Sequence, residues 1–237
     1  DPEVYEPDRS LVPSHPQARP PFIFTKEELV ALFDAARNYP CYPYAPLAPS
    51  SYVLWLTLLY CCGLRSTEAL RLQLQDVDIE QGIFTIRMTK FRKSRLVPMA
   101  SGLCESVQEY LKRRGELGFA MEPDSPLLIN LKHKAYHPSA LNPVFRKLIR
   151  SAGIAPHPNS RPPRPHDLRH TLAVHRLAKW YQQDIDVQSR LRWLSTYMGH
   201  VKTENNEVYL NITAHGPMSP SHRFESLCAR NLGGDHD

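Results

Sequence analysis

The sequence PHDLRH at residues 165–170 opens the stretch that decides the fold of this chain. Apolar residues recur at helical spacing from Leu168 to Tyr181, so we predict a helix that begins at this motif. His166 and Arg169 are then one turn apart on one face, near the start of the helix. The unpaired N–H groups of a helix start attract anions, and an arginine fork can hold two phosphate oxygens at once. The motif therefore indicates phosphate chemistry.

The same stretch closes at Tyr209. The apolar spacing over Val187–Met198 predicts a second helix, which Gly199 ends in a left-handed conformation. His200 is thereby expected just beyond a helix end. Thr203 can cap a short last helix that carries Tyr209.

Charge is unevenly distributed along the 237 residues. The formal net charge is only +5, but the segment Lys132–Lys202 holds 13 lysines and arginines against three acids, Asp167, Asp184 and Asp186. A basic surface of this kind would attract a polyanion such as DNA. A solvated basic face is the alternative explanation for any single charge run.

Other compositional features narrow the class of protein. The most apolar run, Tyr52–Cys62, has about half the ~20 residues that a membrane span requires, so we predict a buried helix there. No signal-peptide pattern opens the chain, and we expect an intracellular, cytoplasmic protein associated with prokaryotic DNA. The five cysteines are odd in number and form no C-x-x-C pair, which favours reduced thiols over disulfides or a zinc site.

The chain begins with a proline-rich segment, residues 1–23, which we interpret as a linker or arm. Thr25 and Glu28 form a capping box at the start of a first helix. A buried helix follows over residues 51–62. Further helices are predicted over residues 102–114 and 142–153, the second with Asn142 as its cap.

Arg65 follows a glycine stop at Gly63 and precedes a new helix. Glu68 lies one turn further on and can hold the Arg65 guanidinium in place. An arginine beside a helix cap is common, so this pair alone is weak evidence for a site.

The pattern then changes to period two. Residues 83–88 and 95–98 read as two short strands of a hairpin. The loop between them carries Lys90, Arg92 and Lys93, and such a tip can reach into a DNA groove. A solvent-exposed basic hairpin without a role is equally compatible with this pattern.

Taken together, these residues resemble a known family. Arg65 with Glu68, the hairpin Lys90, the His166-x-x-Arg169-His170 motif, Gly199-His200 and Tyr209 occur in the order and near the spacing of the tyrosine recombinase catalytic domain. The chain resembles the integrases of phages, transposons and plasmids from about Thr25 to Tyr209.

The resemblance implies an α+β, mainly helical fold: a DNA breaking-rejoining catalytic domain with a small antiparallel β-hairpin sheet. It implies a catalytic domain over residues 24–214 and makes residues 1–23 the linker from a missing N-terminal DNA-binding domain. Residues 215–237 would form a tail that is exchanged between protomers, or a frayed terminus. The segment between Arg169 and His200 is longer than is usual in the family.

The family's catalytic roles carry over to matching residues of this chain. Tyr209 would attack a phosphodiester and form a 3′-phosphotyrosyl bond. Arg65 and Arg169 would hold the two non-bridging oxygens. His166 would accept or relay the tyrosine proton, and His200 would bind a phosphate oxygen or position the nucleophile.

Lys90 would be the general acid for the departing 5′-oxygen, although Arg92 and Lys93 share its loop and could exchange places with it. We also expect Arg92, Lys93, Arg95 and Arg164 to contact DNA. The resemblance implies no cofactor, metal or ATP, because two arginines and a lysine supply the positive charge that metal ions provide in many nucleases.

The implied partner is double-stranded DNA, bound by a homo-tetramer that is monomeric when free in solution and aided by an accessory DNA-bending or directionality protein. The implied function is site-specific recombination through a Holliday junction. Two alternatives remain: a type IB topoisomerase-like enzyme that relaxes DNA, and a DNA-binding module that has lost catalysis.

Overall fold

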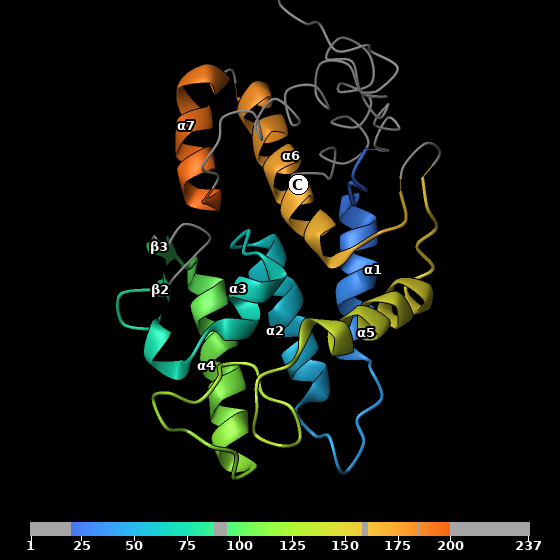
Figure 1. The fold of residues 1–237 in the computed structure, drawn as a ribbon. Helices are drawn as coiled ribbons and strands as arrows, with labels where there is room; N and C mark the ends of the chain where they lie inside the picture. Colours follow the sequence, from blue (N-terminus) through green and yellow to red (C-terminus); the bar gives the residue numbers. More distant parts are fainter. Residues whose placement is uncertain (1–19, 88–93, 158–160, 184, 200–237) are drawn as a thin grey trace, which may run out of the picture.

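The computed structural model describes residues 20–87, 94–157, 161–183 and 185–199 (Figure 1). This part of the chain is mainly helical with one small antiparallel sheet, which confirms the predicted α+β class. The elements are α1 Lys26–Arg37, α2 Ala48–Tyr60, α3 Ser66–Arg71, the 3₁₀ turn η2 Leu74–Asp76, β1 Val77–Asp78, β2 Ile83–Ile86, β3 Arg95–Pro98, α4 Ser101–Glu116, α5 Pro138–Ser151, α6 Pro165–Gln182 and α7 Val187–Met198. None of the described helices is long and apolar enough to cross a membrane.

Helix α1 begins at the predicted capping box. The Thr25 hydroxyl accepts a hydrogen bond from the Glu28 N–H at 3.1 Å, and the Glu28 carboxylate accepts one from the Thr25 N–H at 2.8 Å. These bonds satisfy two backbone donors that a helix start would otherwise leave unpaired. Leu29 and Leu32 then turn inward into the core, as predicted.

Helix α2 is the centre of the fold and packs against α1, α3, α4 and α6 (Figure 1). The burial predicted for it is confirmed, because Trp55, Leu56, Leu58 and Leu59 are at most 1% exposed. The helix begins three residues earlier than predicted, since Pro49 suits the first turn of a helix, where its missing N–H leaves no bond unmade.

The sheet has the order β1-β2-β3, and both pairings are antiparallel. The predicted hairpin is therefore confirmed as β2 and β3, with Phe84 opposite Val97. Both of these residues are fully buried and fix the inward face of the sheet. Strand β1 was not predicted, because a strand of two residues is too short to show an alternating pattern.

Helix α5 corrects the sequence prediction. It begins at Pro138 with His137 as its cap, not at Asn142, and Pro143 lies inside it. The imidazole of His137 accepts a hydrogen bond from the Ser139 N–H at 3.3 Å. Pro138 and Pro143 each suit the first turn of a helix. The helix begins at Pro138, because Leu141 then lies on its buried face.

Helices α6 and α7 pack side by side (Figure 1). They enclose a second, smaller core that is separate from the one around α2. Its members are Ala173, Val174, Leu177, Val187, Leu191, Leu194 and Met198. Tyr181, the last residue of the predicted α6 pattern, is 47% exposed, so the end of α6 extends beyond the core. The segment between Arg169 and His200 thus contains most of α6.

Candidate active site

The structure describes five of the ten residues predicted for catalysis or DNA contact. These are Arg65, Arg95, Arg164, His166 and Arg169. The other five lie outside the described residues and remain predictions. They are Lys90, Arg92, Lys93, His200 and Tyr209.

Arg65 is the N-cap of α3, directly after the turn that ends α2. Gly63 makes this turn with φ of +59°, and a Cβ there would lie 2.8 Å from Leu172 Cδ2. Both constraints favour glycine at this position. The Arg65 Nη1 donates to Glu68 Oε1 at 2.6 Å, which confirms the predicted role of Glu68 as a holder of the guanidinium.

The second terminal nitrogen of Arg65 reaches across the molecule. Its Nη2 donates to the carbonyl of Gly199 at 2.8 Å, directly after the end of α7. Gly199 has φ of +63°, which agrees with the predicted left-handed stop. The Arg65 side chain remains 28% exposed. A partly exposed guanidinium beside a helix end can still accept an anion from solution.

Glu68 is bound by a second arginine that sequence reasoning did not connect to it. Arg95, the first residue of β3, forms two hydrogen bonds to the Glu68 carboxylate. Burial works to raise the pKa of Glu68, but the hydrogen bonds and charges of Arg95 and Arg65 outweigh it and lower the pKa to about 2. Glu68 is therefore a permanent anion between two guanidinium groups.

Arg169 lies in the second turn of α6 and is 1% exposed. Its guanidinium donates to the carbonyl of Gly63 and to the carbonyl of Met198. It therefore joins the turn before α3 to the last residue of α7. Positive groups are favourable at this helix end, because the last carbonyls of α7 carry the negative end of the helix dipole.

His166 differs from Arg169 in its surroundings. The two residues lie one turn apart near the start of α6, as predicted, but His166 is exposed and Arg169 is buried. The His166 ring meets the ring of His170 edge to face, with centroids 4.8 Å apart. His170 lies one helical turn after His166, and this ring contact holds His166 near the surface of the site.

Two further residues shape the start of α6. Arg164 is its exposed N-cap, and its N–H donates to Asp167 Oδ2 at 2.8 Å. Asp167 is fully buried and pairs with Arg161 at 2.5 Å. Burial raises the pKa of Asp167, and the hydrogen bonds of Arg161 and Arg164 act against this shift. Asp167 thus has a structural role that its place within the PHDLRH motif did not reveal.

Tyr197 is the described tyrosine nearest to this cluster in sequence. It is half-buried on α7, and its hydroxyl donates to the carbonyl of Cys61 at 3.3 Å. Burial raises the pKa of this hydroxyl, so the reactive phenolate is disfavoured. Tyr197 therefore has a packing role beside the second core.

The arrangement gathers three guanidinium groups and one carboxylate around the end of α7. Arg65 and Arg169 contact the carbonyls of the last helical residue and its successor, and Arg95 joins them through Glu68. The cluster has a net charge of +2. Such a concentration of fixed donors can bind a phosphate and stabilise additional negative charge on it.

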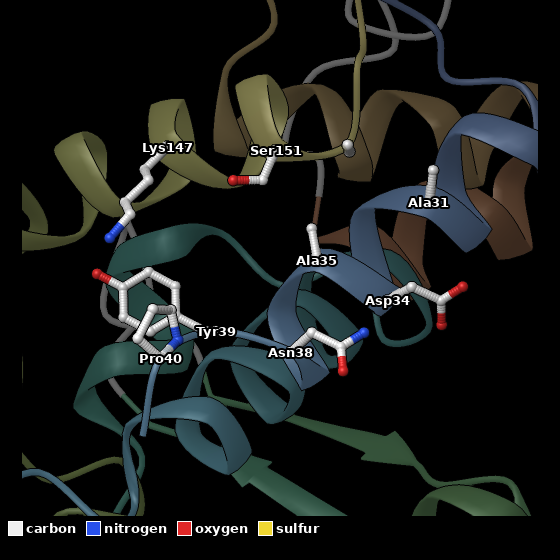
Figure 2. A pocket seen from close by; sticks show the side chains of 9 residues that line it. Ala31, Asp34, Ala35, Asn38, Tyr39, Pro40, Lys147 and Ser151 are labelled. Atoms are coloured by element: carbon white, nitrogen blue, oxygen red, sulfur yellow. The ribbon is translucent and has the colours of Figure 1, made fainter. Parts of the chain in front are cut away.

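The described cavities lie elsewhere. One of about 390 Å³ is formed by α1 and α5, where Tyr39 and Lys147 face each other (Figure 2). The Lys147 ammonium lies 4.6 Å from the centre of the Tyr39 ring. A second cavity of about 420 Å³ is lined mainly by tyrosines and aliphatic residues. Neither cavity includes a residue of the arginine cluster, which reaches the surface through Arg65.

Comparison with known proteins finds relatives over most of the chain. The model of the phage integrase family matches residues 23–215. The putative integrase/recombinase y4rB of Sinorhizobium fredii is 36% identical over 211 residues, which are 89% of this chain and 67% of that protein. Tyrosine recombinase XerC of Rhizobium meliloti is 32% identical over 158 residues, which are 66% of this chain and 44% of that protein. The chain therefore spans between 44% and 67% of the length of these two relatives.

Solved structures share the fold. A crystal structure of XerA recombinase superimposes with a TM-score of 0.64 at 21% identity and covers 92% of this chain and 67% of its own. The XerH site-specific recombinase, bound to a palindromic difH substrate after cleavage, gives a TM-score of 0.63 at 23% identity, over 88% of this chain and 53% of that one.

Proposed function

The chain belongs to the phage integrase family of tyrosine recombinases, and from this premise we propose that it cuts and rejoins DNA at a specific site through a covalent bond to Tyr209. The observation that carries the proposal is the meeting of Arg65 and Arg169 at the end of α7. Distant parts of the sequence supply these two arginines. Arg65 donates to the carbonyl of Gly199, which precedes His200, and Arg169 donates to the carbonyl of Met198.

The proposed step is an exchange of one phosphate ester for another. The Tyr209 oxygen attacks phosphorus, the bond from phosphorus to the 5′-oxygen breaks, and a 3′-phosphotyrosyl bond forms. The tyrosine loses one proton and the 5′-oxygen gains one, so the step neither consumes nor releases a proton overall. Because the phosphate ester bond is conserved, a 5′-hydroxyl can reverse the reaction without ATP.

Charge on phosphorus oxygens is the main barrier that the described residues address. Two non-bridging oxygens carry more negative charge as phosphorus becomes five-coordinate, and Arg65 and Arg169 would stabilise them. Arg65 is pre-oriented by Glu68 at 2.6 Å and by the Gly199 carbonyl at 2.8 Å. Fixed donors of this kind need little reorganisation during the reaction, which is why they favour the transition state.

Proton transfer falls to the remaining predicted residues. His166, exposed at the start of α6, would accept or relay the tyrosine proton. Lys90 would protonate the 5′-oxygen, because an alkoxide is a poor leaving group. His200 would bind a phosphate oxygen or position Tyr209.

Double-stranded DNA is the proposed partner. The solved relatives include XerH bound to its difH substrate and a lambda integrase dimer bound to a core site. We propose that four copies of the full protein act on two DNA sites through a Holliday junction and exchange the tail, residues 215–237. This chain spans 67% and 44% of the length of the two relatives, so the assembly is proposed for the full protein.

Covalent capture tests this function and identifies the target site in the same experiment. The wild-type protein is incubated with random-sequence duplexes that carry a nick, so that the released fragment diffuses away and the adduct accumulates. DNA that stays attached to denatured protein is then sequenced. We expect adducts with a shared sequence, formed equally in the presence of a metal chelator and lost in Tyr209→Phe.

Three results would contradict the proposal. Adducts that persist in Tyr209→Phe would place the nucleophile elsewhere. Adducts without any shared sequence, together with relaxation of supercoiled DNA, would indicate a topoisomerase-like enzyme. DNA binding without any adduct would indicate a binding module.

A further inference from the structure

We infer that Arg95 is a positioning residue of the proposed reaction, which holds Glu68 and through it fixes the guanidinium of Arg65. The inference rests on the proposed function, because it assigns Arg95 a part in the same phosphate site. Neither the family resemblance nor the position of Arg95 at the start of β3 indicates this role.

Arg95 binds the Glu68 carboxylate in a bidentate manner. Arg95 Nη1 lies 3.1 Å from Glu68 Oε1, and Nη2 lies 2.8 Å from Oε2. A planar guanidinium can match both oxygens of a carboxylate in this way, whereas a lysine ammonium can provide only a point charge. The side chains are 13% and 8% exposed, so solvent screens the pair only weakly.

Each oxygen of Glu68 also serves Arg65. Oε1 accepts from Arg65 Nη1 at 2.6 Å, and Oε2 accepts from the Arg65 N–H at 2.9 Å. The carboxylate is thus fixed in its plane by Arg95 on one side and by Arg65 on the other. If Arg95 no longer formed both bonds, the carboxylate could rotate, and the direction of the Arg65 guanidinium would change with it.

Arg95 also lies against the end of α7. A Cβ added to Gly199 would be 2.8 Å from Arg95 Nη1, 3.1 Å from Cζ and 3.3 Å from Nε. The Gly199 carbonyl is the acceptor of Arg65 Nη2. Arg65 and Arg95 therefore approach the same residue, and Arg95 joins β3 and α3 to the end of α7.

Direct contact with DNA was the role expected for Arg95 from the sequence. The structure favours positioning, because both terminal nitrogens of Arg95 bind the carboxylate that also binds Arg65, and the Arg95 side chain is less exposed than that of Arg65, 13% against 28%. The two roles predict different kinetics. A DNA contact affects binding, whereas a positioning residue affects the rate once DNA is bound.

The test uses Arg95→Lys on a DNA site obtained by covalent capture with the wild-type protein. We expect the rate of adduct formation at saturating DNA to fall about 10- to 100-fold, the range that a misplaced catalytic group typically causes. The dissociation constant for DNA should change by less than about 3-fold. Arg87→Lys is the matched control, because Arg87 lies at the same end of the hairpin but pairs with Asp76 and not with Glu68.

Two further measurements separate positioning from a loss of folding. In a Glu68→Gln background, Arg95→Lys should have little further effect on the rate, because both changes break one arrangement. A substrate with a neutral methylphosphonate at the cleaved position lacks one charged oxygen, so it depends less on Arg65. On this substrate we expect the rate penalties of Arg65→Lys and Arg95→Lys to shrink together.

The inference is overturned if Arg95→Lys weakens DNA binding more than about 10-fold while the saturated rate is unchanged, which would restore the DNA-contact role. It is also overturned if the rate penalty persists in full on the methylphosphonate or in the Glu68→Gln background. Failure of the proposed function itself looks different, because the wild-type protein then forms no adduct with any duplex.

Discussion

Glu68 holds its negative charge far below neutral pH, because its pKa is lowered to about 2 by the two arginines that bind it. In the unfolded chain its pKa returns to about 4.3. The unfolded state therefore binds the proton more readily between these values. The stability that Glu68 contributes is complete above about pH 4.5 and is lost as the pH falls toward 2.

We predict that Glu68→Gln lowers the free energy of unfolding by about 3 kcal/mol at pH 7, because it leaves Arg65 and Arg95 without their carboxylate. Thermal unfolding of the variant and the wild type should be compared from pH 7 down to pH 3. The difference in midpoint should narrow below pH 4.5. A difference that stays constant down to pH 3 would show that Glu68 is not held as an anion in the folded protein.

Gly199 is constrained in two ways, by its φ of +63° and by Arg95 at 2.8 Å from any added Cβ. Gly153 shares only the first constraint, because its φ is +66° and its Cβ would meet no atom within 4 Å. We predict that both alanine variants lose about 1 kcal/mol of stability from backbone strain. Only Gly199→Ala should also slow adduct formation, by about 10-fold or more.

The two alanine substitutions introduce similar backbone strain, so a difference between their adduct rates reports on the contact with Arg95. Equal adduct rates for Gly199→Ala and Gly153→Ala would mean that the packing of Arg95 against the end of α7 has no effect on the reaction. Midpoints of thermal unfolding provide the stability control.

One buried hydroxyl, that of Thr171, links α6 to the residues just before α1. Thr171 on α6 donates to the carbonyl of Asp167 at 2.8 Å and accepts from the N–H of Phe24 at 3.1 Å, just before α1. Thr171 and Phe24 are fully buried. Without the hydroxyl, the Phe24 N–H would lose the partner that the structure shows for it.

We predict that Thr171→Val, which keeps the shape of the side chain, destabilises the protein by about 1–3 kcal/mol, the cost of a buried unpaired donor. Thr171→Ser keeps the hydroxyl and should lose less. Chemical denaturation of both variants measures the difference. No loss in Thr171→Val, together with a loss in Thr171→Ser, would instead assign the stability to packing of the methyl group.

Whether a helix or strand could be predicted depended on how clear its sequence pattern was. Capping residues and apolar periodicity were sufficient for α1, α6 and α7. The apolar run of α2 predicted its burial but not its start. The start of α5 was predicted wrongly, because Pro138 and Pro143 both suit a first turn and only the packing of Leu141 selects between them. Strand β1 is too short to carry a pattern.

In the whole molecule, the sequence order of the site residues and their spatial arrangement carry different information. The Arg65–Glu68 pair could be predicted because both residues lie within one turn. The bond from Arg95 to Glu68 could not, because it depends on how β3 packs against α3. The same holds for the bonds of Arg65 and Arg169 to the end of α7, which only the assembled fold creates.

The arginine cluster reaches the surface through Arg65, and none of its residues lines either of the described cavities. A DNA duplex is too large for a cavity of about 390 Å³ such as the one between α1 and α5. A phosphate on the outside of a duplex instead requires donors at an accessible edge. The end of α7 provides this edge, where α3, β3 and α6 contribute one arginine each.

The most direct test of the account is to identify the residue that carries DNA. The captured adduct is digested with nuclease and protease, and the peptide that retains a nucleotide is located by mass spectrometry. We expect a 3′-nucleotide on Tyr209. A nucleotide on another residue, for example on the half-buried Tyr197, would contradict it.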